Sequence, residues 1–166
     1  MRRIAVAALT AAGAALAACG AAPPAVDGLG LPLHRPVTEQ QLRHHRQSAL
    51  LYPGSRPIRQ VGADEHAHPG DHEPDPAYAG VRATATVPAA TLMAWYDQQL
   101  TARGYSRAAY YRPSDQNAGA AWTIPHSREQ VQVGVYTAPS ADVGTVGSTV
   151  YEQLLVSYRV TGPPPP

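Results

Sequence analysis

The chain contains no lysine and no phenylalanine, and it has a single cysteine, Cys19. A lone cysteine excludes an internal disulfide and every zinc site that needs two or more thiolates. The absence of lysine excludes a P-loop, a Schiff-base enzyme and a Ser-x-x-Lys hydrolase. Thirteen arginines against twelve acidic residues leave a formal charge of +1, which argues against a nucleic-acid-binding protein.

The first 18 residues have the features of a secretory signal peptide. Arg2 and Arg3 form a short positive region, and the fifteen residues from Ile4 to Ala18 are uncharged and mostly apolar. This run is too short to span a bilayer, which needs about 20 residues. We therefore expect residues 1–18 to be removed and to take no part in the fold.

The apolar run ends in Leu16-Ala17-Ala18-Cys19, which matches a lipobox. Over this stretch the N-terminus resembles that of bacterial lipoproteins. The resemblance implies that the chain is cut before Cys19, that the Cys19 sulfur carries a diacylglycerol, and that the new amine is acylated. It also implies a location at the cell membrane, lipid-anchored and facing the extracytoplasmic side. Two or more acyl chains anchor a protein stably, whereas one chain binds reversibly.

Composition divides the rest of the chain into three parts. Residues 19–36 start with the lipidated cysteine and continue as a stretch rich in Ala, Pro and Gly with almost no charge, which predicts a flexible tether. Residues 37–161 are long enough for one domain with its own core. Residues 162–166 end in four prolines and are expected to form an exposed polyproline II tail.

Two helices are expected in residues 37–161. Thr38 followed three positions later by Gln41 fits a capping box and predicts a short helix up to Leu51. A longer helix is expected over 88–103, because apolar residues recur there at every third or fourth position. Gly104 directly follows and is typical of a helix C-terminus.

Alternating apolar and polar residues predict six strands. They are expected over 58–62, 81–87, 105–112, 120–124, 130–137 and 150–160. One long helix within a run of strands is typical of an α+β fold. We expect an antiparallel sheet of about four to six strands, with the main helix packed on one face and a short N-terminal helix.

Residues 87–105, VPAATLMAWYDQQLTARGY, carry a second and shorter resemblance. The segment is similar to a pattern in small extracytoplasmic bacterial domains of unknown function. In that pattern a helix bearing a Trp-Tyr or Phe-Tyr pair runs into a Gly-aromatic step and then into a meander of strands. The resemblance implies an extracytoplasmic domain and carries no known activity.

The stretch from Asp64 to Asp75 is acidic and rich in histidine, with five carboxylates and three histidines in twelve residues. Imidazole and carboxylate are the usual ligands of Zn²⁺, Ni²⁺ and Cu²⁺. The same composition also fits a solvated surface loop that needs no cofactor, so both interpretations stay open. The candidate metal ligands are His66, His68, His72, Asp64 and Asp71.

Nine tyrosines and two tryptophans supply all the aromatic side chains. Aromatic rings with polar tips suit a surface that binds flat or apolar ligands. Without phenylalanine, however, the same rings must also fill the core, so both uses remain possible at each position. The candidates for a ligand-binding sheet face are Tyr110, Trp122, Tyr136 and Tyr158.

No nucleophile motif or recognisable pair of catalytic carboxylates is present, so we do not expect an enzyme. The leading hypothesis is a membrane-anchored extracytoplasmic lipoprotein whose domain binds another component of the cell envelope, such as a second envelope protein. One alternative is a metal-binding lipoprotein that uses the His66, His68 and His72 loop. Another is a small-ligand binder that uses the Tyr/Trp face.

Overall fold

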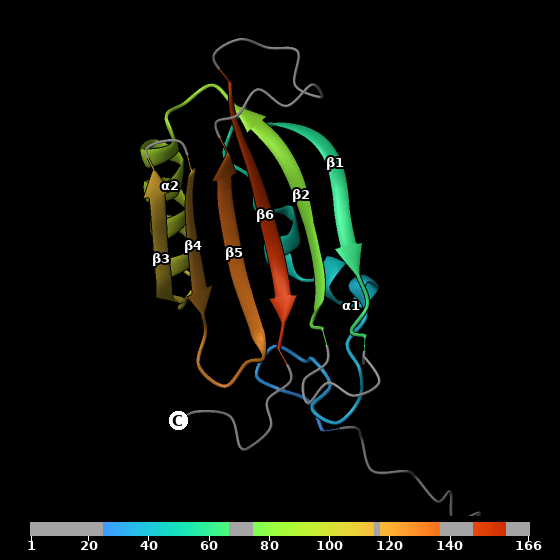
Figure 1. Cartoon of the computed structure of the whole chain (residues 1–166). Coiled ribbons are helices and arrows are strands. Elements are labelled where there is room, and N and C mark those ends of the chain that lie inside the picture. Colours follow the sequence, from blue (N-terminus) through green and yellow to red (C-terminus); the bar gives the residue numbers. More distant parts are fainter. Residues whose placement is uncertain (1–24, 67–74, 115–116, 137–147, 159–166) are drawn as a thin grey trace, which may run out of the picture.

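The computed structural model describes residues 25–66, 75–114, 117–136 and 148–158 (Figure 1). The predicted lipidation site Cys19 and the expected proline-rich tail lie outside these residues. So do the candidate metal ligands His68, Asp71 and His72.

All six expected strands are present, and they form one sheet. The sheet is antiparallel throughout, in the order β1-β2-β6-β5-β4-β3. Strands β3 to β6 follow one another as a meander, and β6 then pairs with β2. Together with two helices this confirms the α+β class. The strands are β1 Arg56–Ala63, β2 Ala77–Ala85, β3 Ser106–Ser114, β4 Asn117–Thr123, β5 Glu129–Tyr136 and β6 Thr149–Ser157.

The short N-terminal helix begins as predicted but ends early. In α1 (Glu39–Arg43) the capping box between Thr38 and Gln41 is formed in both directions. The chain then enters a separate 3-10 turn over 46–49. Ser48 contributes to the break, because its hydroxyl donates a hydrogen bond to the Arg43 carbonyl. In an unbroken helix this carbonyl would accept from a backbone N–H instead.

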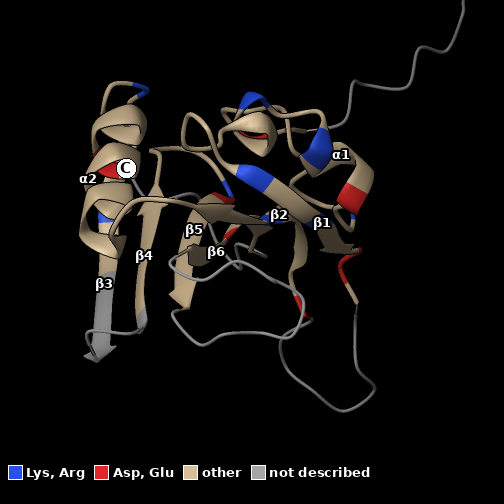
Figure 2. Cartoon of the chain, turned by 90° about the horizontal axis from the view of Figure 1, so that it is seen from above, with Lys and Arg blue, Asp and Glu red and all other residues tan. Residues whose placement is uncertain are grey.

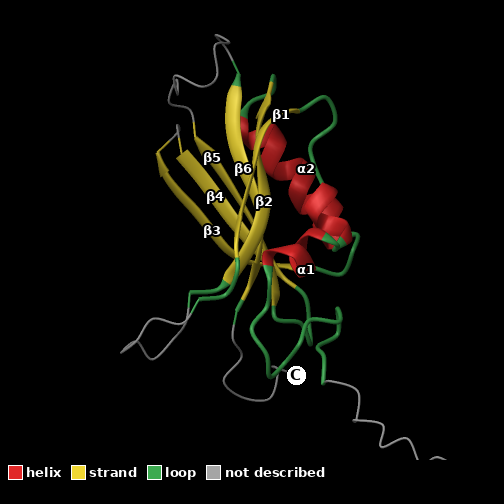
Figure 3. Cartoon of the chain, turned by 90° about the vertical axis from the view of Figure 1, so that its right-hand side faces the viewer, coloured by secondary structure: helices red, strands yellow, loops and turns green. Residues whose placement is uncertain are grey.

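The long helix α2 (Ala89–Thr101) supplies the centre of the core. Its apolar stripe is buried as the sequence predicts. The Tyr96 ring lies 6.4 Å from the Trp122 ring of β4 and 6.0 Å from the Tyr151 ring of β6, centroid to centroid. Gly104 adopts φ 87°, the left-handed conformation that ends helices favourably. Views from above and from the side place α1 and α2 on the same side of the sheet (Figures 2 and 3).

The expectation of a flexible tether up to Pro36 is wrong for its second half. Leu31 is only 1% exposed and belongs to the hydrophobic core. Val26 pairs with Pro32 in an isolated β-bridge, and the Gly28 N–H donates to the His126 carbonyl over 2.7 Å. The weak hydrophobic pattern of this segment hid its buried residues, and the segment from Val26 to Pro32 belongs to the folded domain. Neither helix in the described part of the chain is long and apolar enough to cross a membrane.

Candidate functional site

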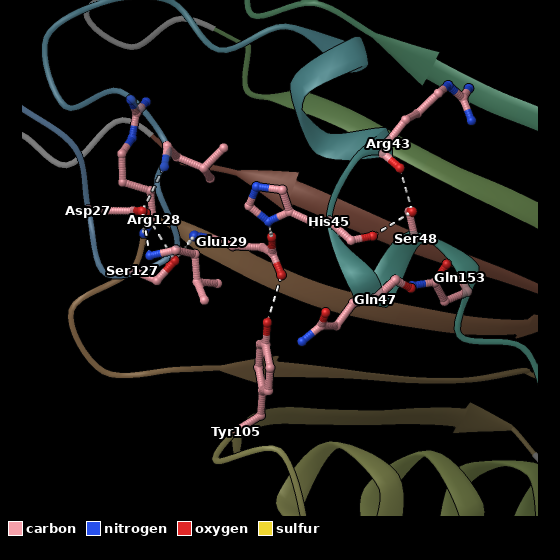
Figure 4. A network of polar contacts seen from close by, with 12 residues as sticks. Asp27, Arg43, His45, Gln47, Ser48, Tyr105, Ser127, Arg128, Glu129 and Gln153 are labelled. Atoms are coloured by element: carbon pink, nitrogen blue, oxygen red, sulfur yellow. Dashed lines mark hydrogen bonds and ion pairs between the residues drawn. The ribbon is translucent and has the colours of Figure 1, made fainter. Parts of the chain in front are cut away.

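A buried polar network lies at the end of the sheet where β5 begins (Figure 4). Its centre is Glu129, which is 1% exposed. The Tyr105 hydroxyl donates to Glu129 Oε1 over 2.7 Å, and His45 Nδ1 donates to Glu129 Oε2. The backbone N–H of Glu129 donates to Ser127 Oγ over 3.0 Å. The network therefore ties the turn before the 3-10 helix to the start of β3 and β5.

Arg128 extends this network toward the N-terminal segment. Its guanidinium, 2% exposed, donates to the carbonyls of Pro32 and Tyr158 and to Glu65 Oε2, the last over 3.3 Å. Its backbone N–H donates over 2.7 Å to Asp27 Oδ2. A guanidinium is planar and always charged, so it holds several acceptors in fixed places.

The chemistry available to this network is structural. The carboxylates of Asp27 and Glu129 accept hydrogen bonds from groups of the chain itself, and Glu65 accepts from Arg128 and from the Val37 N–H. The oxygen atoms of these buried carboxylates are directed at the chain itself and away from solvent. The network joins distant segments of the chain.

The contact between His45 and Glu129 makes stability depend on pH. The hydrogen bond to Glu129 raises the pKa of His45 above its ordinary value of about 6.5. Because the folded pKa exceeds the unfolded one, this stabilisation is complete below pH 6.5 and is lost as the pH rises through the folded pKa. Urea unfolding should therefore show a larger fall in the free energy of unfolding between about pH 6 and 8 for the native chain than for His45→Gln.

The neighbouring histidine provides the control for this experiment. His44 is exposed and its Nδ1 lies 2.6 Å from the Gln40 carbonyl oxygen, outside the buried network. His44→Gln should keep the pH dependence of the native chain. If the free energy of unfolding changes equally with pH in the native chain and in His45→Gln, the His45–Glu129 contact does not contribute to this pH dependence.

A different surface lies on the side of the sheet away from the two helices, which we call the far face. Residues of neighbouring strands that pair directly point to the same side, so the register defines this face. It is the side opposite the buried row of Ala83, Tyr151 and Val135. Its central residues are Val61, Gly80, Arg82, Gly119, Ala121, Gln132, Gly134, Tyr136, Glu152 and Leu154.

An apolar groove of about 240 Å³ lies on the far face over β3 to β6. Its floor is bare backbone at Gly119 of β4, which pairs directly with Gly134 of β5, and the end of the Tyr136 side chain lies over Gly134. The groove is also lined by Tyr136, Glu152 and Leu154. Glycines inside strands often mark places where another group approaches the backbone closely.

Beyond the groove, on β2 and β1, the residues that pair in register with the groove residues include arginines. Gly134 pairs with Glu152, Glu152 with Arg82, and Arg82 with Arg59. Arg82 Nε donates to Glu152 Oε1 over 2.8 Å, whereas Arg56 and Arg59 are exposed. Among the described side chains of the strands, Glu152 is the one acid on this face. The far face therefore combines an apolar groove with an excess of positive charge beside it.

The structure separates the four aromatic residues predicted for a ligand face. Trp122 is fully buried on the helix side, where its Nε1 donates to Asp97 Oδ1 over 3.0 Å, so its assignment to an exposed face is wrong. Tyr136 and Tyr158 are 44% and 42% exposed, and Tyr136 borders the groove. Tyr110 lies in β3, but its side chain is outside the described ones. A ligand-binding role of Tyr136 and Tyr158 stays a prediction.

The expected metal site also stays a prediction. Asp64 accepts a hydrogen bond from the Glu39 N–H over 2.7 Å, at the start of α1. His66 is exposed and forms an isolated bridge with Asp75. Within the described ranges, no three of the His, Cys, Asp and Glu side chains come together as a metal site. The remaining candidates lie outside these ranges.

Sequence reasoning missed both the network and the groove. His45, Arg128 and Glu129 carry no local pattern that distinguishes them from surface residues. Gly134 did carry a signal, because it interrupts the pattern of the strand expected over 130–137, whereas Gly119 precedes the strand expected over 120–124. Comparison of the chain with protein-family models, with curated proteins and with solved structures gives no match.

Proposed function

We propose that the protein is a membrane-anchored extracytoplasmic lipoprotein and not an enzyme. In this proposal the helices pack on one face of the sheet, and the domain binds another component of the cell envelope through the far face. The anchor is supported by the lipobox that ends at Cys19. The binding role is carried by one observation, the apolar groove bordered by Tyr136 and Leu154.

The position of the groove suits an anchored protein. In Figure 1 the N-terminal segment, in blue, lies at one end of the sheet, and β5 runs away from it. Tyr136 is the last residue of β5, so the groove lies toward the end of the sheet away from the N-terminal segment of the described chain. The absence of an enzymatic role is supported by the buried network, whose carboxylates are engaged in holding the fold.

The anchor is tested by replacing Cys19. Cys19→Ala removes the sulfur that would carry the diacylglycerol, so the lipid-dependent attachment should be lost. We expect the native protein to take up radiolabelled palmitate and the Cys19→Ala protein to take up none. Retention of the label by Cys19→Ala would contradict the anchor.

The binding surface is tested by cross-linking from two alanines. A photoreactive residue at Ala121, in the groove, is compared with the same residue at Ala94, which is exposed on α2. In intact cells we expect a defined cross-linked product from Ala121 that is absent from Ala94. Identical products from both positions, or none from Ala121, would contradict a binding role of the far face.

A further inference from the structure

We propose that the far face binds one anionic single-chain amphiphile, with its apolar chain over Gly119 beside the Tyr136 ring and its anionic head at Arg59 and Arg56. This inference rests on the proposed function, because it takes the far face as the binding surface. It adds the chemical class of the ligand and the residues that recognise each end of it.

The floor of the groove is suited to a thin apolar chain. Gly119 and Gly134 face each other across β4 and β5, and in the next row Ala121 pairs with Gln132. The volume of about 240 Å³ is below the ~300–1,000 Å³ of typical ligand pockets. A single alkyl chain fits such a shallow trough better than a bulky ring system or a folded partner.

The backbone around the groove disfavours an extended peptide as the occupant. β4, β5 and β6 each have a paired strand on both sides, so the sheet uses their N–H and C=O groups. A peptide lying there would leave its own backbone groups without partners, which is costly away from water. An alkyl chain has no such groups to satisfy.

The arginines supply the other half of the recognition. Arg59 lies directly opposite Arg82, and like charges in this position repel each other. Glu152 offsets Arg82, which leaves Arg59 and Arg56 in excess. From Gly134 to Arg59 the row crosses three strand spacings, about 14 Å. A ligand with an apolar chain and an anionic head can therefore contact the groove and the arginines at once.

Octyl phosphate is the probe for this proposal, and 1-octanol and inorganic phosphate are its two halves. All described contacts lie between residues 25 and 158, so a chain of residues 20–166 keeps every one of them. In calorimetric titrations of this chain we expect 1:1 binding of octyl phosphate, at least about tenfold tighter than that of either half. The difference arises because the whole molecule contacts the groove and the arginines together.

Two variants separate the ends of the ligand. Gly119→Val should weaken octyl phosphate binding at least about tenfold by filling the floor. A Cβ at Gly119 would lie 3.6 Å from the Val133 carbonyl oxygen, an ordinary contact, so the fold should tolerate it. The double variant Arg56→Gln and Arg59→Gln should reduce the affinity for octyl phosphate to that for 1-octanol.

Matched substitutions outside the site serve as controls. Thr123→Val places the same valine side chain on the same strand and face but outside the groove, and Arg103→Gln removes an exposed arginine at the end of α2. Both should bind octyl phosphate like the unaltered chain. No binding of octyl phosphate, affinity equal to that of inorganic phosphate, or affinity unchanged by Gly119→Val would overturn the proposal. A product cross-linked from Ala121 would in that case still support the far face as a binding surface for a different partner.

Discussion

Replacement of Arg128 by methionine should lower the free energy of unfolding by about 3–5 kcal/mol, the cost of breaking a buried ion pair. Methionine keeps much of the length of the side chain but removes its donors. Glu65, whose side chain is 4% exposed, would lose its cationic partner, and the Pro32 and Tyr158 carbonyls would lose a donor. Urea unfolding measures the change in the free energy of unfolding. The slope of this free energy against urea concentration should stay the same if the denatured state is unaltered.

Two comparisons show whether the buried charge is the cause. Arg103→Met removes an exposed arginine that donates to Gln99, and it should change stability by no more than about 0.5 kcal/mol. Adding Glu65→Gln to Arg128→Met removes the buried carboxylate that Arg128 no longer contacts and should recover part of the loss. A loss below about 1 kcal/mol for Arg128→Met would mean that this pair does not hold the N-terminal segment in place.

Truncation of Trp122 to alanine should cost about 3–5 kcal/mol, the range for large aromatic residues in a core. Trp122 is fully buried, and its ring lies beside that of Tyr96. The loss combines reduced apolar burial with the cavity left behind. Thermal or urea unfolding of Trp122→Ala against the native chain measures it.

A conservative variant separates the ring from its polar edge. Trp122→Phe keeps most of the apolar contact but removes the Nε1 hydrogen bond to Asp97, so it should cost about 1 kcal/mol plus the smaller loss of volume. Arg107 would still donate to the Asp97 carboxylate. If Trp122→Ala costs no more than Trp122→Phe, the ring does not act as a core residue.

Buried Trp122 and the glycine-floored groove lie on opposite sides of one sheet, and this arrangement separates stability from binding. The side with α2 contains the buried rings of Tyr96, Trp122 and Tyr151, whereas the far face carries the two glycines, the exposed Tyr136 and the arginines. Substitutions in the groove such as Gly119→Val can therefore alter ligand binding without removing core contacts. This separation is what makes the proposed ligand experiment interpretable.

The sequence by itself determined the type and order of the elements. The capping box at Thr38, the apolar stripe of α2 and the end of that helix at Gly104 each depend on residues a few positions apart, so they can be recognised without any tertiary contact. The same holds for the strands, whose alternation is a local property. The lipobox at Cys19 is local as well, and the anchor that it predicts awaits the Cys19→Ala experiment.

Only the tertiary structure decided which face of each strand is buried and which distant residues meet. In β6 both alternating sets are apolar, with Val150 and Leu154 in one and Tyr151 and Leu155 in the other, so the pattern could not choose between them. The choice follows from the packing of Tyr96 against Tyr151. Pairing of β4 with β5 likewise placed two glycines opposite each other and formed the groove.

The buried network shows the same limit most clearly. His45 and Glu129 are 84 positions apart, and Asp27 and Arg128 are 101 apart. Such partners are selected by the closure of the whole sheet and not by any neighbouring residue. Local hydrogen-bonding and hydrophobic preferences therefore fixed the elements of this protein, whereas long-range packing decided the buried partners, the extent of the domain and the surface proposed to bind a ligand.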